Sequence, residues 1–231
     1  MQADVVVVAA GQGRRLQKQI PKQFFPLAGK PILAHTLKIF EQHPRVEDII
    51  IVGATDWLFH ISTEIVDKFG FEKVNRVIAG GAERQYSVAK GIAALESGQR
   101  PVLIHDGVRP FVRAGLIDRI LDGFEDADAC IPILPCVDTI KEIEGGWIKK
   151  TIPRANLRRV QTPQAFKLDK LREAFQLAER KSRIATDDAA LVEEIQGKIR
   201  WVEGEQDNIK ITTAFDLKIA NLILDEKNIC E

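Results

Sequence analysis

The sequence predicts an α/β fold: a predominantly parallel sheet flanked by helices, with a projecting β-hairpin arm. Short β-branched runs alternate along the chain with stretches of helical period. The runs are apolar throughout, which is typical of strands covered on both faces of a parallel sheet. One polar segment interrupts this alternation and predicts the arm. Repeated strand–helix units imply right-handed crossovers, with ligands beyond the carboxyl ends of the strands.

The expected strands and helices follow directly from these patterns. Strands are predicted at residues 4–9, 48–52, 74–79, 101–105 and 128–134, and later at 199–202 and 208–212. Apolar stripes such as Leu33, Leu37 and Phe40 predict helices at 32–40, 116–124 and 217–224. Helices are also expected at 167–180 and 186–196. We expect a single domain over residues 1–231.

The arm spans residues 137–159, with Gly145-Gly146 as its turn. It has too few apolar residues for a core of its own, and a two-stranded ribbon is marginal alone. We therefore expect it to lie on another surface, with a second subunit as the favoured candidate. The alternative is a mobile surface excursion.

Composition limits the classes of partner. Thirty-three basic residues balance thirty-three acidic ones, so there is no general positive field for nucleic acid or an anionic membrane. The three cysteines are odd in number and lack zinc-type spacing, which favours core thiols in a reducing compartment. The first residues show no basic segment followed by a long apolar one. Cytoplasm is the expected location.

The first loop, after residues 4–9, concentrates positive charge beside two glycines. Gly11 and Gly13 offer backbone N–H groups to phosphate oxygens, and the stretch adds the cations Arg14, Arg15, Lys18 and Lys22. This suits a polyanion such as a triphosphate. A dinucleotide fold of the dehydrogenase type is the rival, but Leu16 stands where Gly or Ala is required. A plain glycine turn is the other alternative.

Ala9-Ala10-Gly11-x-Gly13-x-Arg15 followed by Pro21-Lys22-Gln23 resembles the signature loop of sugar-phosphate nucleotidyltransferases. More narrowly, it resembles that of the Rossmann-like methylerythritol phosphate cytidylyltransferases. The resemblance implies that the loop wraps the CTP phosphates, with Arg15 and Lys22 stabilising charge at the α-phosphate. Val8 departs from the proline common in the family.

Two further loops extend the resemblance. Gly80-Gly81 with Ser87 is a weak signal alone, since helix capping explains it equally well; the family likeness assigns these residues to cytosine and ribose. Asp106 ends a strand, where a carboxylate can hold Mg²⁺ on phosphates, although it could also simply cap its turn or pair with Arg109. His105 is expected to point into the sheet. By resemblance Asp106 is a metal ligand, and Arg109 contacts the acceptor phosphate.

The later motifs complete the expected site. The resemblance assigns methylerythritol phosphate binding to Arg109, Thr139, Arg154, Thr162, Thr186 and Lys210. Thr139 and Arg154 lie on the arm, which by the same resemblance serves the neighbouring subunit of a homodimer. Helix N-capping by Thr186 is a sufficient alternative for that residue. Asp207 is expected to complete the metal site with Asp106.

The resemblance implies a cytidylyltransferase that joins CMP from CTP to 2-C-methyl-D-erythritol 4-phosphate and releases pyrophosphate, a step toward isoprenoid precursors. Mg²⁺ or another divalent cation is the expected cofactor. The catalytic residues implied are Arg15, Lys22, Arg154 and Lys210, and the CTP-binding residues are Ala9, Ala10, Gly11, Gly13, Arg15, Lys22, Gly80, Gly81, Ser87 and Asp106. Ribitol-5-phosphate cytidylyltransferase and a non-catalytic nucleotide sensor are the alternatives.

Overall fold

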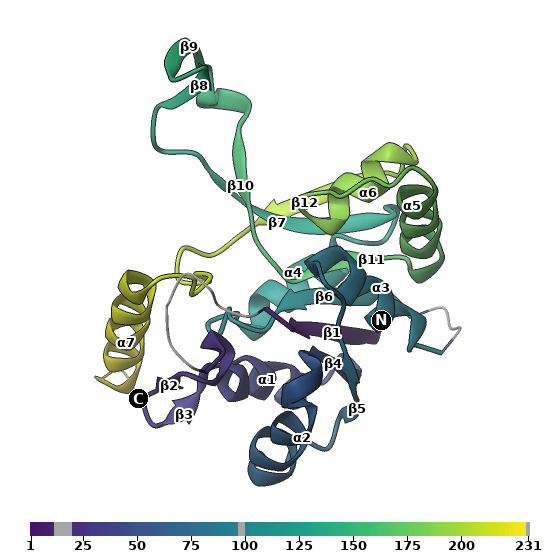
Figure 1. The fold of residues 1–231 in the computed structure, drawn as a ribbon, viewed down its shortest axis with the longest axis vertical. Coiled ribbons are helices and arrows are strands. Elements are labelled where there is room, and N and C mark those ends of the chain that lie inside the picture. Colours follow the sequence, from purple (N-terminus) through teal and green to yellow (C-terminus); the bar gives the residue numbers. More distant parts are fainter. Residues whose placement is uncertain (12–19, 97–99, 230–231) are drawn as a thin grey trace.

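A computed structural model describes residues 1–11, 20–96 and 100–229 (Figure 1). Its centre is an eight-stranded sheet in the order β10-β7-β11-β6-β1-β4-β5, with β12 paired to β7. The strands are β1 (Ala3–Ala9), β4 (Val46–Gly53), β5 (Val74–Ala79), β6 (Val102–Asp106), β7 (Ala129–Pro135), β10 (Arg158–Val160), β11 (Gln164–Phe166) and β12 (Ile199–Glu203). The pairs around β1, namely β6-β1, β1-β4 and β4-β5, are all parallel. The predicted fold class is confirmed.

Strand β1 shows why a central strand of this sheet has apolar side chains on both faces. Val5 and Val7 belong to the core on one face of the sheet, and Val6 belongs to the core on the other. Side chains alternate across a strand, so a strand covered on both faces needs apolar residues at every position. The two faces therefore bury all three valines completely.

Helices cover both faces. The first core includes residues of α1 (Ile32–Gln42) and α4 (Ala114–Asp122), and the second includes residues of α3 (Arg84–Ala93), α5 (Leu168–Arg180) and α6 (Asp188–Glu194). A third cluster packs α7 (Ala214–Ile229) on the short β2 (Pro26–Leu27), which pairs with β3 (Lys30–Pro31). Between β4 and β5 lie η3 (Thr55–Trp57), α2 (Leu58–His60) and the π-helical turn η4 (Ile61–Asp67).

The structure differs from the prediction on one side of the sheet. Strands β10 and β11 pair antiparallel with β7, and β11 also pairs antiparallel with β6. The strand expected at 208–212 is wrong, because this segment is anchored by separate contacts and not by a ladder. Asn208 donates to the Thr162 carbonyl at 2.9 Å, and the Ile211 N–H donates to the Val108 carbonyl at 2.9 Å.

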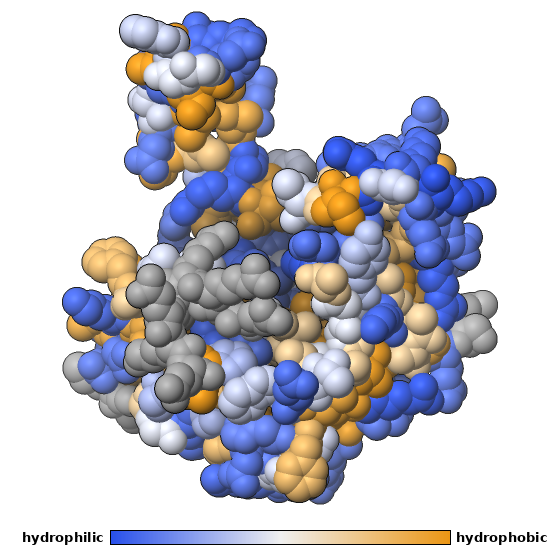
Figure 2. Space-filling model, viewed as in Figure 1, coloured by the Kyte–Doolittle hydropathy of each residue, from blue (hydrophilic) through white to orange (hydrophobic). Residues whose placement is uncertain are grey.

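A hairpin of β8 (Ile140–Glu144) and β9 (Trp147–Ile152) projects from the body, followed by the turn η5 (Arg154–Asn156) (Figure 1). Gly145 and Gly146 both have positive φ, 56° and 85°, which explains the glycine pair at the turn. Figure 2 shows apolar side chains among hydrophilic ones on this projection. Ile143 and Trp147 are 72% and 81% exposed. Separately, no helix in the described ranges has the length and apolar character to cross a bilayer.

Candidate active site

A cavity of about 560 Å³ opens where β1, β5 and β6 end. Parallel neighbours end at the same edge, so their following loops converge there. The cavity is lined by Val8, Ala9, Ala10, Gly11, Lys22, Gln23, Gly81, Ala82, Glu83, Arg84, Ser87, Asp106, Val108 and Lys210. The structure thus brings together most of the predicted CTP-binding residues, and adds Lys210 from the segment after β12.

The glycine loop after β5 is pressed against the end of β1. A Cβ on Gly80 would lie 2.6 Å from the Cβ of Ala10 and 2.8 Å from the Ser87 hydroxyl, so only glycine fits. The Ser87 hydroxyl accepts from the Gly81 N–H at 3.1 Å and donates to the Glu83 carbonyl at 3.1 Å. These bonds hold the start of α3 at the cavity wall. Gly80 itself supports this wall and does not line the cavity.

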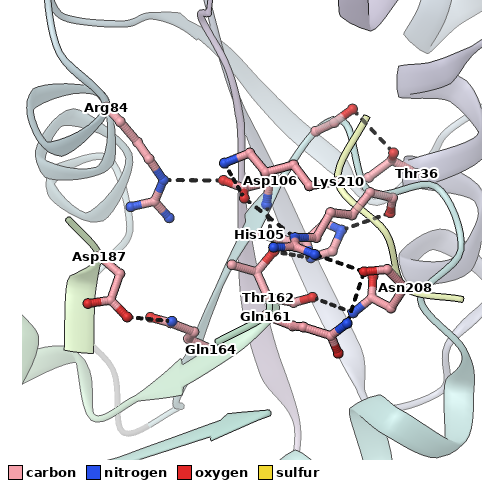
Figure 3. A network of polar contacts seen from close by, with 12 residues as sticks. Thr36, Arg84, His105, Asp106, Gln161, Thr162, Gln164, Asp187, Asn208 and Lys210 are labelled. Atoms are coloured by element: carbon pink, nitrogen blue, oxygen red, sulfur yellow. Dashed lines mark hydrogen bonds and ion pairs between the residues drawn. The ribbon is translucent and has the colours of Figure 1, made fainter. Parts of the chain in front are cut away.

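Asp106 is buried among three cations (Figure 3). Its carboxylate lies 3.2 Å from Arg84 Nε, 2.8 Å from Lys210 Nζ and 3.5 Å from Arg109 Nε. Burial alone would raise the pKa of this carboxyl. Arg84, then Lys210 and Arg109, outweigh burial and hold the pKa well below its usual range. Asp106 therefore stays ionised at the bottom of the cavity.

His105 lies beneath Asp106 inside the sheet, as predicted, and packs edge-on against Phe40. Burial lowers its pKa to about 3, with Asp106 opposing the fall, so the ring is neutral at pH 7. Its Nε2 faces the Arg109 carbonyl at 3.2 Å and must carry the proton, because a carbonyl only accepts. Nδ1 therefore accepts from the Thr162 hydroxyl at 3.1 Å, and that oxygen accepts from the Asp106 N–H at 3.1 Å. This chain ties the β6 terminus to the segment before β11.

Two residues predicted to contact the acceptor phosphate are held by hydrogen bonds inside the protein. The Thr162 hydroxyl is buried, and its proton is donated to His105. Arg109 is also buried; it donates to the Asn208 carbonyl at 2.8 Å, and burial lowers its pKa. Neither residue is among those that line the cavity. In this arrangement both position Asp106 and the segment that carries Lys210.

The remaining predicted residues lie away from the cavity lining. Thr139 and Arg154 are exposed on the arm, where Arg154 donates to the Val137 carbonyl. Thr186 is exposed, and the alternative that it caps a helix is wrong, because Asp187 caps α6 by accepting from the Ala190 N–H at 3.1 Å. Asp207 is not among the residues that line the cavity, and it forms an ion pair with Arg113. Gly13 and Arg15 lie outside the described residues.

Sequence reasoning missed three residues of this site. Arg84 lines the cavity and bridges two buried carboxylates, Asp106 and Asp188. Gln23, also at the cavity, donates to the Ala9 carbonyl at 2.6 Å and holds the first loop to the end of β1. Arg84 and Asp188 stand within the quoted motifs Glu83-Arg84 and Thr186-Asp187-Asp188, but their spacing of about one hundred residues gives no signal of contact.

The side chains around the cavity can be compared with the ligands that a divalent cation requires. Among the described residues, no group of three or more His, Cys, Asp or Glu side chains could form a protein cage for a metal. Two carboxylates line the cavity, Asp106 and Glu83. Glu83 is the N-cap residue of α3, and Asp106 is the one held among the cations. One carboxylate fits a hard cation that takes its other ligands from phosphate oxygens and water, as Mg²⁺ usually does.

Backbone loops, two lysines, Arg84 and the ionised Asp106 meet at the strand ends of a Rossmann-like sheet, which is the arrangement expected of a nucleotidyltransferase. The sequence profile of the family "IspD: 2-C-methyl-D-erythritol 4-phosphate cytidylyltransferase" matches residues 3–226.

Two relatives named 2-C-methyl-D-erythritol 4-phosphate cytidylyltransferase are similar over nearly their whole length. The one from Geotalea uraniireducens is 41% identical, covering 99% of both chains, and the one from Halalkalibacterium halodurans is 42% identical, covering 98% of this chain and 99% of the relative. The crystal structure of 4-diphosphocytidyl-2C-methyl-D-erythritol synthase from Anaerococcus prevotii superposes with a TM-score of 0.83 at 29% identity, covering 97% of this chain and 98% of its own. This chain belongs to the 2-C-methyl-D-erythritol 4-phosphate cytidylyltransferase family.

Proposed function

We propose that this enzyme joins CMP from CTP to 2-C-methyl-D-erythritol 4-phosphate and releases pyrophosphate, a step toward isoprenoid precursors. The phosphate monoester of the acceptor attacks the α-phosphorus of CTP, a new P–O bond forms, and the bond to the β-phosphate oxygen breaks in line. Family membership and the full-length relatives support this assignment.

The observation that carries the chemistry is the set of cations around one cavity. Lys22 and Lys210 line it from separate segments, and Arg84 lines it from α3. The nucleophile is already an anion, so the difficulty is bringing two anions together and spreading charge over the α-phosphate. Fixed cations at the cavity wall supply this stabilisation without reorganising during the reaction.

No general base is required, and the site is consistent with that. His105 directly precedes Asp106 in the sequence, but it is buried, neutral and hydrogen-bonded at both ring nitrogens. It cannot reach a ligand in the cavity. Catalysis in this proposal is therefore positioning together with electrostatic stabilisation, in which Arg15 and Lys22 act on the triphosphate and Lys210 on the incoming phosphate.

A divalent cation is part of the proposal, with Mg²⁺ as the expected ion. Asp106 would hold it through its carboxylate, and Asp207 would join only by leaving Arg113. When bound, such a cation neutralises charge on the triphosphate and favours departure of pyrophosphate. Lys210 and Arg84 already occupy the Asp106 oxygens, so the cation must share them or displace these pairs.

We also propose a homodimer in which the arm, residues 137–159, serves the partner's cavity. The apolar side chains of its hairpin are exposed in the single chain, including Trp147 at 81%. Thr139 and Arg154 lie on the arm and do not line this chain's own cavity, which suits a role in trans for acceptor binding. The free thiols Cys130 and Cys136 suit the proposed cytoplasmic location.

The test is pyrophosphate release from a panel of nucleoside triphosphates crossed with a panel of polyol phosphates. We expect turnover with CTP, Mg²⁺ and 2-C-methyl-D-erythritol 4-phosphate. Turnover with ribitol 5-phosphate alone would overturn the acceptor assignment. CTP binding by calorimetry without pyrophosphate release from any acceptor would overturn the enzymatic assignment in favour of a nucleotide sensor.

A further inference from the structure

Arg84 bridges two buried carboxylates that come from distant parts of the chain. Its Nε lies 3.2 Å from Asp106, and its two terminal nitrogens lie 3.0 and 2.8 Å from the two oxygens of Asp188. Asp188 is 1% exposed, and Arg84 lines the cavity. The guanidinium thus faces a fully enclosed partner on one side and the reaction site on the other.

The Asp188 side of this bridge is anchored by its own contacts. Asp188 is the first residue of α6, and the preceding Asp187 caps that helix while accepting from Gln164 at 3.0 Å. Gln85, next to Arg84 on α3, donates to the Arg183 carbonyl and accepts from the Ala185 N–H, both at 2.9 Å. The start of α3 and the segment leading into α6 are therefore held together at several points.

We propose that Asp188 is a positioning residue for nucleotidyl transfer: its two-oxygen pair with Arg84 fixes that guanidinium on the nucleotide cavity wall. There Arg84 holds Asp106 in place and presents its remaining N–H groups to the triphosphate. A guanidinium has five N–H groups, of which these three bonds use three. This inference rests on the proposed function, in which Arg84 is already one of the cations of the cavity wall, and it adds Asp188 as the residue that fixes Arg84 there.

The geometry explains why both partners must be these residue types. A planar guanidinium can pair two oxygens of one carboxylate and still direct Nε at a second, whereas a lysine offers one point charge. An asparagine at position 188 would keep the shape of the aspartate side chain. It would present one acceptor oxygen and one NH2 group to Arg84 in place of two charged oxygens. The guanidinium would then be free to turn toward Asp106 or the phosphates.

The experiment compares steady-state pyrophosphate release for Asp188→Asn, Arg84→Lys and the double variant. We expect Asp188→Asn to lower kcat/KM for CTP by about 10- to 100-fold, as loss of a group that orients a site residue typically does. The KM for the polyol phosphate should stay near the wild-type value. Glu194→Gln is the matched control, because Glu194 lies on the same helix as Asp188 but pairs with Arg183, and neither of these two residues lines the nucleotide cavity. It should leave kcat/KM unchanged.

The double variant separates positioning from a general structural role. If Asp188 acts through Arg84, the double variant is about as slow as Arg84→Lys alone. The proposal would be overturned if the fold-losses in kcat/KM of the two single variants multiplied in the double variant, or if Asp188→Asn had the wild-type kcat/KM. Should Asp188→Asn fail to fold, Arg84→Gln replaces it: a loss of about 10²–10³ in kcat/KM is expected, and wild-type activity would overturn the proposal. Wild-type enzyme inactive on every acceptor would instead overturn the proposed function.

Discussion

The buried, neutral state of His105 makes the stability of the fold depend on pH in a way that can be calculated. Its folded pKa of about 3 lies below the ordinary value of 6.5. The unfolded chain therefore binds this proton first, and the stabilisation is fully present above pH 6.5 and lost as pH falls toward 3. At 1.36 kcal/mol per pH unit, the complete loss is up to about 5 kcal/mol, of which about 2 kcal/mol falls between pH 7 and 5.

The test compares the free energies of unfolding of wild type and His105→Gln by urea titration at pH 7, 6 and 5, followed by circular dichroism. Glutamine does not titrate. At pH 7 the free energy of unfolding of the variant should be lower than that of wild type by about 1–3 kcal/mol, because the Thr162 hydroxyl or the Arg109 carbonyl loses its partner. It should then lose about 2 kcal/mol less than wild type on going to pH 5. Carboxylates titrate in both proteins, so the difference isolates His105. Equal pH dependence in the two proteins would refute the reasoning.

Three further predictions concern the site and the arm. Lys22→Ala and Arg15→Ala should each lower turnover by about 10²–10³ with unchanged thermal unfolding, and near-normal turnover would remove that residue from transition-state stabilisation. Chelation by EDTA should stop pyrophosphate release and excess Mg²⁺ should restore it; release that persists without divalent cations contradicts the metal proposal. Trp147→Lys should shift the protein from dimer to monomer in sedimentation velocity at unchanged helix content, whereas a monomeric wild type would remove the role of the arm in trans.

The parallel part of the sheet could be predicted because its strands have a local signature. Val5, Val6 and Val7 must all be apolar when both faces of β1 are covered, and this is visible in the five consecutive apolar residues Val5–Ala9. Strands β10 and β11 are only three residues long, and β11 has the polar Gln164 within it. These short segments form strands because the backbones of β7 and β6 are available to pair with them. That pairing depends on the tertiary structure and leaves no local pattern in the sequence.

The cavity could be predicted for the same topological reason. Glycines and Lys22 follow one strand, Gly81 follows another and Asp106 ends a third, and strand ends of one sheet meet. The sequence could not show which polar side chains line the cavity and which are held by partners inside the protein. Thr162 and Arg109 match motif positions, but their direction is decided by buried partners such as His105 and Asn208. The link from Arg84 to Asp188 joins positions 104 residues apart and depends on how α6 docks.

The central claim is that an acceptor phosphate oxygen attacks the α-phosphorus of CTP. Supplying 2-C-methyl-D-erythritol 4-phosphate with ¹⁸O in its phosphate and analysing the products by mass spectrometry tests this directly. We expect all of the label in the cytidine diphosphate conjugate and none in pyrophosphate. Label in pyrophosphate, or a conjugate that has lost it, would contradict the account.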